Sequence, residues 1–217
     1  MKNNYLIVLV LLMYFPSVSS ASKSVNSQSF ELLLGSAWNM RENIRIKQDE
    51  EPDIVIKDAH FDVEPFTRPI YYGFRWAFFV GEDGAWELEM NHLKMYLSNP
   101  PSEVDHLEVS HGYNLVWLNR AWYINEFIIH TGAGVVVPHP DIMVRGKTDY
   151  DPGLGAYTIA GPSLHASVQK KFDISESWFI SLETKVVVAS AYIQIAEGSV
   201  VVPNRSFHAN FGFGYEF

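Results

Sequence analysis

The C-terminal segment Phe207 to Phe217 has an aromatic or small apolar residue at every second position. In a β-strand, alternate side chains point to opposite faces of the sheet. One face therefore carries Phe207, Ala209, Phe211, Phe213, Tyr215 and Phe217, and the other carries His208, Asn210, Gly212, Gly214 and Glu216. A closed β-barrel satisfies every backbone hydrogen bond in lipid, and its lipid-facing and lumen-facing residues alternate in this way. The segment therefore predicts a membrane-spanning strand with its aromatic face toward lipid.

The N-terminal segment has the three parts of a secretory signal peptide: Lys2, the apolar run from Tyr5 to Phe15, and small residues that end at Ala21. We expect cleavage after Ala21. The apolar run is shorter than the roughly 20 residues that a spanning helix needs. We therefore predict a signal peptide over residues 1–21 and one outer-membrane barrel domain over residues 22–217.

Composition limits the chemistry. The chain contains no cysteine, which excludes thiol nucleophiles and thiolate metal sites. Its formal net charge of −9 argues against nucleic acid as a partner, because nucleic-acid binders carry basic patches.

Alternating segments predict eight strands, an even number that suffices for a small membrane barrel. The expected strands are Glu31 to Met40, Pro69 to Val80, Ala85 to Leu97, His106 to Leu118, Trp122 to Val137, Tyr157 to Phe172, Trp178 to Tyr192 and Ser206 to Phe217. The predicted fold class is all-β, an eight-stranded antiparallel transmembrane barrel of the bacterial outer membrane. We expect a monomer with both termini in the periplasm.

The predicted connections alternate in length, as in outer-membrane barrels with short periplasmic turns and long outer loops. Short links are expected at Gly81 to Gly84, Asn119 to Ala121 and Asp173 to Ser177, and long ones at Arg41 to Arg68, Ser98 to Asp105, Pro138 to Ala156 and Ile193 to Arg205. The first long connection contains two short apolar alternations, so we expect it to extend the barrel as a hairpin.

An eight-stranded barrel has room for side chains but no open channel, so its inward polar groups must satisfy one another. The expected inward residues are Arg75, Glu87, Glu89, Glu108, Ser110, Asn114, Glu126, His130, Ser163, His165, Ser167, Gln169, Glu183, Lys185, His208 and Asn210. On the fourth strand, this assignment turns Leu107, Val109, Tyr113, Leu115 and Trp117 toward lipid.

The third strand breaks its alternation at Asn91-His92, which predicts a β-bulge there. Pairing the third and fourth strands would then place His92 near Ser110 and Lys94 near Glu108. A tight turn around Arg120 would add His130. The sequence thus predicts a polar belt inside the loop-end half of the barrel.

Several motifs together resemble the outer-membrane lipid A oxidase family. They are Tyr72-Gly-Phe-Arg75, His92-x-Lys94-x-Tyr96, Glu108-x-Ser110-x-Gly112-x-Asn114, Gly132-Ala-Gly134 followed by Pro138-His139, and Gly161-Pro162. The chain departs from the family pattern at Asn91 and His111, where the family has Thr and Asp. The resemblance implies oxidation of the proximal glucosamine of lipid A in the outer leaflet, with dioxygen and a divalent metal. We therefore expect a catalytic rim site of His92, Lys94, Glu108 and Ser110.

The residue types at the rim also suit a metal. His92, Glu108 and His139 come from strand ends that should meet, and two histidines with one carboxylate is the arrangement that binds non-haem iron for dioxygen chemistry. We predict Fe or Mn at these three residues.

Other functions fit the same residues. A lipid A deacylase or esterase would use Ser110 with His92 or His130 and with Glu89 or Glu126. A non-enzymatic barrel for envelope integrity or adhesion would need the polar side chains only to pair inside the lumen.

Overall fold

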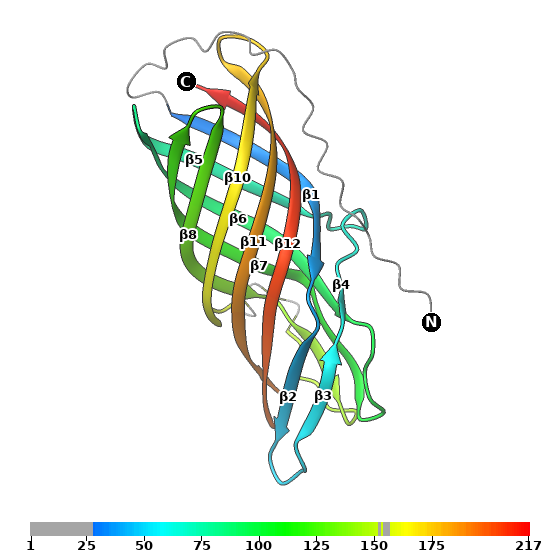
Figure 1. Ribbon diagram of the computed structural model, residues 1–217. Coiled ribbons are helices and arrows are strands. Elements are labelled where there is room, and N and C mark those ends of the chain that lie inside the picture. Colours follow the sequence, from blue (N-terminus) through cyan, green and yellow to red (C-terminus); the bar gives the residue numbers. More distant parts are fainter. Residues whose placement is uncertain (1–27, 152, 154–156) are drawn as a thin grey trace.

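The computed structural model describes residues 28–151, 153 and 157–217. The predicted signal peptide lies outside these residues. The described chain forms one antiparallel sheet of twelve strands (Figure 1). The strands are β1 (Ser29–Asn39), β2 (Glu42–Gln48), β3 (Ile54–Ala59), β4 (Phe61–Asp62), β5 (Tyr72–Gly81), β6 (Gly84–Leu97), β7 (Val104–Ile124), β8 (Phe127–Pro138), β9 (Asp141–Val144), β10 (Gly161–Asp173), β11 (Trp178–Ile195) and β12 (Gly198–Glu216). The described residues contain no helix long and apolar enough to cross a membrane.

Eight of these strands close into a barrel. Their order is β1, β5, β6, β7, β8, β10, β11 and β12, and β12 pairs again with β1. The closing register runs from Ser29 opposite Glu216 to Asn39 opposite Ser206. The predicted eight-stranded antiparallel barrel is therefore confirmed.

The other four strands lengthen the barrel at one end, which lies at the bottom of Figure 1. The β2–β3 hairpin continues beyond β1 and pairs with β12, while β4 pairs with β6 and β9 pairs with β7. The expected hairpin in the connection Arg41 to Arg68 is thus confirmed. We call this end the loop end and the opposite end the turn end.

Two predicted connections were wrong. The turn between β7 and β8 lies at Asn125-Glu126, because Ile124 pairs with Phe127. Asn119 and Arg120, expected in that turn, remain in β7. There Asn119 bonds a lumen carboxylate and the guanidinium of Arg120 lies over two tryptophan rings, so neither residue needs solvent.

The long connection predicted from Ile193 to Arg205 was also wrong. The structure has a two-residue turn between Ile195 and Gly198 instead. Residues on both sides of this turn are buried, including Ile193, Val200 and Val202. Burial of this apolar surface favours a long hairpin over an exposed loop.

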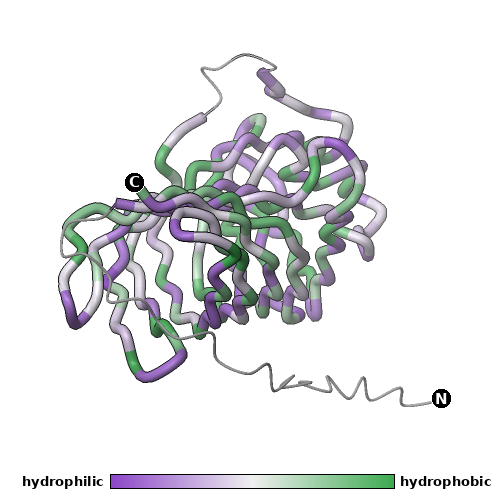
Figure 2. Tube along the Cα trace, turned by 90° about the horizontal axis from the view of Figure 1, so that it is seen from above, coloured by the Kyte–Doolittle hydropathy of each residue, from purple (hydrophilic) through white to green (hydrophobic). Residues whose placement is uncertain are grey.

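The lipid face has the predicted alternation on most strands. On β12, Phe211, Phe213 and Tyr215 are exposed while His208 and Asn210 are buried. Figure 2 shows the corresponding alternation of hydrophobic and hydrophilic residues along the barrel wall. Apolar side chains exposed at every second position match a wall in contact with acyl chains.

A polar network fills the turn-end half of the lumen. Arg75 is its centre: it forms ion pairs with Glu31 at 3.0 Å, with Glu89 at 2.9 Å and with Glu183. Lys185 pairs with the same Glu89 and Glu183. Of the predicted inward residues, all are buried except Glu108, Ser110, Asn114 and Glu126. The cavity at the turn end measures only about 30 Å³, room for about two water molecules.

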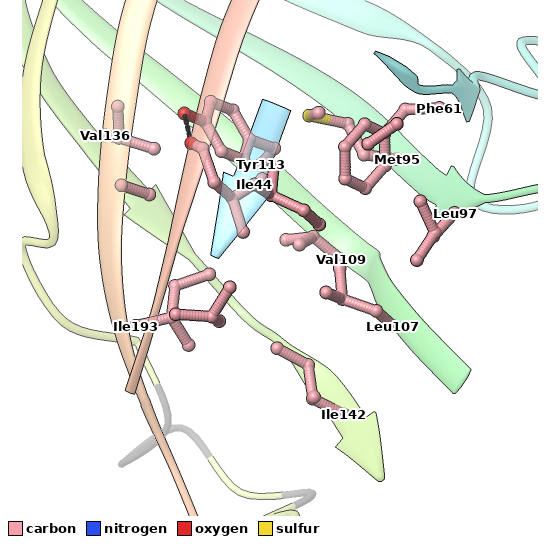
Figure 3. Close-up of a cluster of buried hydrophobic side chains, with 14 of the residues drawn as sticks. Ile44, Phe61, Met95, Leu97, Leu107, Val109, Tyr113, Val136, Ile142 and Ile193 are labelled. Atoms are coloured by element: carbon pink, nitrogen blue, oxygen red, sulfur yellow. Dashed lines mark hydrogen bonds between the residues drawn. The ribbon is translucent and has the colours of Figure 1, made fainter. Parts of the chain in front are cut away.

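The loop-end half of the interior is apolar instead. Leu107, Val109, Tyr113, Leu115 and Trp117 of β7, predicted to face lipid, are at most 1% exposed and point inward. They pack with residues of β2, β6, β9 and β11, and Figure 3 shows ten labelled members of this cluster. The predicted orientation of β7 was wrong because it assumed that the lumen is polar along the whole length of the barrel. The extended strands instead enclose an apolar interior, so the polar face of β7 points outward.

Candidate functional site on the outer wall

The predicted rim residues lie on the outer wall of the barrel and not in its lumen. His92 shares its face of β6 with Met90 and Leu88, and Leu88 is 47% exposed on the lipid side. Asn114 shares its face of β7 with Leu118, which is 50% exposed. The predicted polar belt therefore exists, but it faces the membrane.

His92 is nevertheless covered. In the strand register it lies opposite Tyr72 on one side and Asn114 on the other. The Tyr72 ring stacks on the imidazole, with 4.8 Å between ring centroids and an angle of 17° between planes. His92 is only 4% exposed as a result. A ligand can reach the ring only when a covering side chain moves.

The hydrogen bonds around His92 determine which of its nitrogens carries the proton. The amide of Asn114 is oriented by its Nδ2, which donates to the carbonyl of Val137 at 3.0 Å. Its Oδ1 therefore faces His92 Nδ1, at 2.9 Å, and an amide oxygen can only accept. Nδ1 of His92 must donate, which leaves Nε2 with the lone pair in the neutral ring. This Nε2 is buried and has no hydrogen-bond partner among the described residues.

The β-bulge beside this site is on β7 and not at Asn91-His92 of β6. The register runs from Leu93 opposite Tyr113 directly to Met95 opposite Val109, so β7 contains two extra residues there. Gly112 lies in the bulge with a φ of +122°. A Cβ at this position would come within 2.6 Å of His92 Nδ1, so both the backbone conformation and the close approach require glycine.

The bulge brings a second histidine cluster to the same wall. The backbone N–H of His139 donates to the carbonyl of Gly112 at 2.9 Å. The His139 ring lies 5.0 Å from that of His111 and 4.6 Å from that of Tyr157. Its Nε2 donates to the carbonyl of Asp151 at 2.9 Å, which leaves a buried Nδ1 with no partner among the described residues. His139 thus repeats the pattern of His92: one nitrogen donates and the other is a free acceptor.

The sequence did not predict the contributions of His111, Tyr150 and Tyr157. His111 alternates in phase with Val109 and Tyr113, which were predicted to face lipid, so no role in the polar belt was predicted for it. The structure explains that position, since His111 belongs to the outward bulge. Nothing in the spacing of Tyr150 and Tyr157 shows that they pack around His139, because neither residue lies in a strand.

The other predicted catalytic residues are near His92 in the sheet but differ in role. Lys94 is 1% exposed, and its Nζ donates to the carbonyl of Thr67 at 2.9 Å. It therefore holds the segment before β5 against the outer wall. Glu108 lies opposite Tyr96 and Asp141 in the register, beyond the bulge, and Ser110 Oγ lies 3.4 Å from His111 Nδ1.

The predicted esterase arrangements that combine Ser110 with His130 or Glu89 were wrong, because these residues lie on different sides of the barrel wall. Both partners are in the lumen, where His130 Nδ1 lies 2.8 Å from Glu87 and Glu89 pairs with Arg75. Ser110 is on the opposite side of the sheet. Glu126, the remaining lumen candidate, is in the exposed turn at the far end of β7.

The predicted metal site comprises His92, Glu108 and His139. His92 and His139 each offer a free nitrogen on the outer wall. However, no three His, Asp or Glu side chains of the described residues are grouped to hold one metal ion. Fe or Mn binding stays a prediction, and we derive no step through it.

Comparisons with known proteins give the fold. The chain matches no known family profile and no curated protein sequence. Among solved structures, it is similar to outer membrane protein AlkL, determined in lipid bilayers, with a TM-score of 0.53 and 13% identity over 94% of this chain and 95% of that chain. OprG from Pseudomonas aeruginosa follows with a TM-score of 0.45 and 12% identity over 89% of this chain and 96% of that one. The chain therefore has the fold of an eight-stranded outer-membrane β-barrel protein, as both its strand order and its apolar outer wall require.

Proposed function

We propose that the outer-wall cluster around His92 and His139 binds and modifies the saccharide head group of an outer-leaflet glycolipid. The resemblance in sequence motifs points to lipid A as that lipid and to oxidation of its proximal glucosamine, with dioxygen as the oxidant, as the reaction. The observation that carries the proposal is His92 itself. It is a buried imidazole on the lipid-facing wall, with a fixed tautomer and a free acceptor nitrogen.

The chemistry of the cluster supports a sugar ligand. A buried acceptor without a partner costs free energy, on the order of 1–3 kcal/mol. His92 Nε2 and His139 Nδ1 are two such acceptors on one wall. Sugar hydroxyl groups are hydrogen-bond donors and can satisfy both. A hydroxyl bound to Nε2 can also transfer its proton there, so His92 is the residue that we assign as general base.

The position of the cluster supports a lipid in the outer leaflet. On β7, the outward face runs from Trp122 near the turn end, through Arg120, Leu118 and Val116, to Asn114, and the Arg120 guanidinium is covered by two tryptophan rings. These eight steps of about 3.3 Å in a strand tilted by about 40° span roughly 20 Å, close to the roughly 25 Å apolar band of such barrels. His92 and Asn114 therefore lie near the edge of that band, where lipid head groups begin.

The test is mass spectrometry of lipid A from cells with and without the protein. We expect a mass increase of one oxygen that depends on the protein. It should disappear in His92→Ala and Glu108→Gln. The control is His60→Ala, because His60 lies in the outer connection and its ion pair with Asp62 is exposed. Heat-modifiable migration of each variant reports assembly. A normal mass increase in an assembled His92→Ala protein would overturn the role of His92.

Deacylation is a second candidate, and one contact favours it. The Oγ of Ser110 lies beside Nδ1 of His111 on the outer wall, which pairs a hydroxyl with an imidazole where a lipid ester can reach them. The same mass spectra distinguish the two reactions. Loss of an acyl chain that depends on Ser110 would indicate a deacylase and would contradict oxidation.

A further inference from the structure

We propose that a pocket between β9 and β11 binds an acyl chain of the lipid whose head group lies at the His92 and His139 cluster. This inference rests on the proposed function and names the part of the substrate that the head-group site leaves unassigned. The pocket has a volume of about 460 Å³ and is lined by residues of both strands and of the connection between β9 and β10. This volume is within the range of about 300–1,000 Å³ typical of ligand pockets.

The pocket exists because the barrel wall is interrupted. β10 begins only at Gly161, opposite Val136 of β8. Beyond that point β9 pairs with β7 alone, and the last residues of β11, Tyr192 to Ile195, pair with β12 alone. At Ala160, just before β10 begins, backbone hydrogen bonds still join the wall: its N–H donates to the carbonyl of Val136 at 2.9 Å, and its carbonyl accepts from the N–H of Tyr192 at 2.7 Å. The loop end thus has a lateral gap between the edges of β9 and β11.

At the loop end, polar contacts join the segment after β9 to the β2–β3 hairpin and to the β11–β12 turn. Arg145, which follows β9, donates to Gln48 at 2.9 Å and to the carbonyl of Pro52 at 3.0 Å, both in the β2–β3 hairpin. Lys147 pairs with Glu197 in the β11–β12 turn, and this hydrogen bond raises the pKa of Lys147 above its ordinary value. Because these contacts cross the end of the barrel, we expect a ligand of the pocket to enter from the side.

The gap opens on the lipid-facing wall. The outward face of β11 carries Val186, Val188 and then Tyr192, which are all more than half exposed. Tyr192 also lines the pocket, together with Ile159, which is 74% exposed. Deeper in the pocket, Ile142 and Ile193 are each only 4% exposed. The lining is mixed: isoleucines form its apolar part, while Asp149, Asp151 and Gln194 add polar groups. The occupant that fits the apolar part, beside a wall of exposed apolar side chains, is an acyl chain.

The pocket and the histidine cluster share residues. Tyr150 lines the pocket and stacks on His139, with 6.0 Å between ring centroids. Asp151 lines it as well, and its carbonyl accepts the hydrogen bond from His139 Nε2. A single lipid can therefore place its head group at His139 and one chain in the pocket.

Photo-crosslinking tests this inference. The full-length protein is reconstituted into vesicles of a phospholipid with a diazirine in the middle of one acyl chain, and labelled residues are mapped by mass spectrometry. Every outward residue, such as Val188, should be labelled. The decisive positions are the buried Ile142 and Ile193, which a chain reaches only inside the pocket. Val187 is the matched control, since it is 1% exposed on the same face of β11 and does not line the pocket.

We expect label at Ile142 and Ile193 and none at Val187. The variant Ala160→Phe, which adds bulk to the pocket wall, should remove the label from Ile142 and Ile193 and leave Val188 labelled. Label restricted to outward residues would overturn the pocket, whether or not lipid A is modified.

Lipid A mass spectra of the same variant separate this inference from the proposed function. If one lipid occupies both sites, Ala160→Phe should reduce modification at least tenfold. Full modification with the pocket labelling abolished would overturn the shared lipid and leave the head-group site intact. Pocket labelling in a protein that never modifies lipid A would overturn the proposed function.

Discussion

Asn114 accepts a hydrogen bond from Nδ1 of His92, and this contact fixes the His92 tautomer because the amide is itself anchored to the carbonyl of Val137. The free Nε2 of His92 is therefore a consequence of strand pairing: β7 positions the amide, and β6 positions the ring. The reactivity that we assign to His92 depends on a residue that need not touch the substrate.

The first prediction concerns this positioning residue. Asn114→Leu should lower lipid A modification by roughly 10–100-fold, the range observed when a metal-binding histidine loses the partner that orients it. Asn114→Asp should retain most of the lipid A modification, because a carboxylate can still accept the hydrogen bond from Nδ1 of His92. Lipid A mass spectra and heat-modifiability are measured on both variants. Equal loss in the two variants would show that the acceptor at this position does not matter.

The second prediction concerns the bulge glycine. Gly112→Ala should abolish modification, since the added methyl would displace His92 and the φ of +122° strains any other residue by about 1–3 kcal/mol. Gly146→Ala is the control: its φ is +69°, but a Cβ there meets nothing within 4 Å. It should cost only about 1–2 kcal/mol and leave modification unchanged. If Gly112→Ala keeps full activity, close packing of the bulge on His92 is not needed.

The third prediction concerns the lumen. Arg75→Met leaves Glu31, Glu89 and Glu183 without their common cation, and breaking a buried ion pair from one side costs about 3–5 kcal/mol. The midpoint of urea unfolding in detergent should fall accordingly. Arg45→Met, which removes an exposed ion pair with Asp53, should change stability by no more than about 1 kcal/mol. Similar shifts for both variants would contradict a structural role of the network.

The fourth prediction concerns topology. The chain has no cysteine, so single cysteines can be labelled without background. An impermeant maleimide on intact cells should label Asp149→Cys and should not label Asp83→Cys or Asn125→Cys, because the turn end is expected in the periplasm with both termini. Labelling of the two turn positions from outside, with Asp149→Cys protected, would reverse the orientation.

The sequence by itself determined the architecture. The alternation from Phe207 to Phe217 needs a wall with lipid on one side, and most predicted lumen residues, such as Arg75 and Lys185, are buried in one network. Local patterns were sufficient here because the two faces of these strands differ strongly in polarity.

Only the tertiary structure decided which face of β7 meets the membrane. Alternation places Tyr113 and Leu115 on one face of the strand and Asn114 on the other. It does not show which of the two faces points into the barrel. The choice follows from an apolar interior built by strands distant in sequence, with Ile44 from β2 and Ile193 from β11. Hydrophobic burial at that end turns the apolar face of β7 inward, and the polar rim residues consequently point toward lipid.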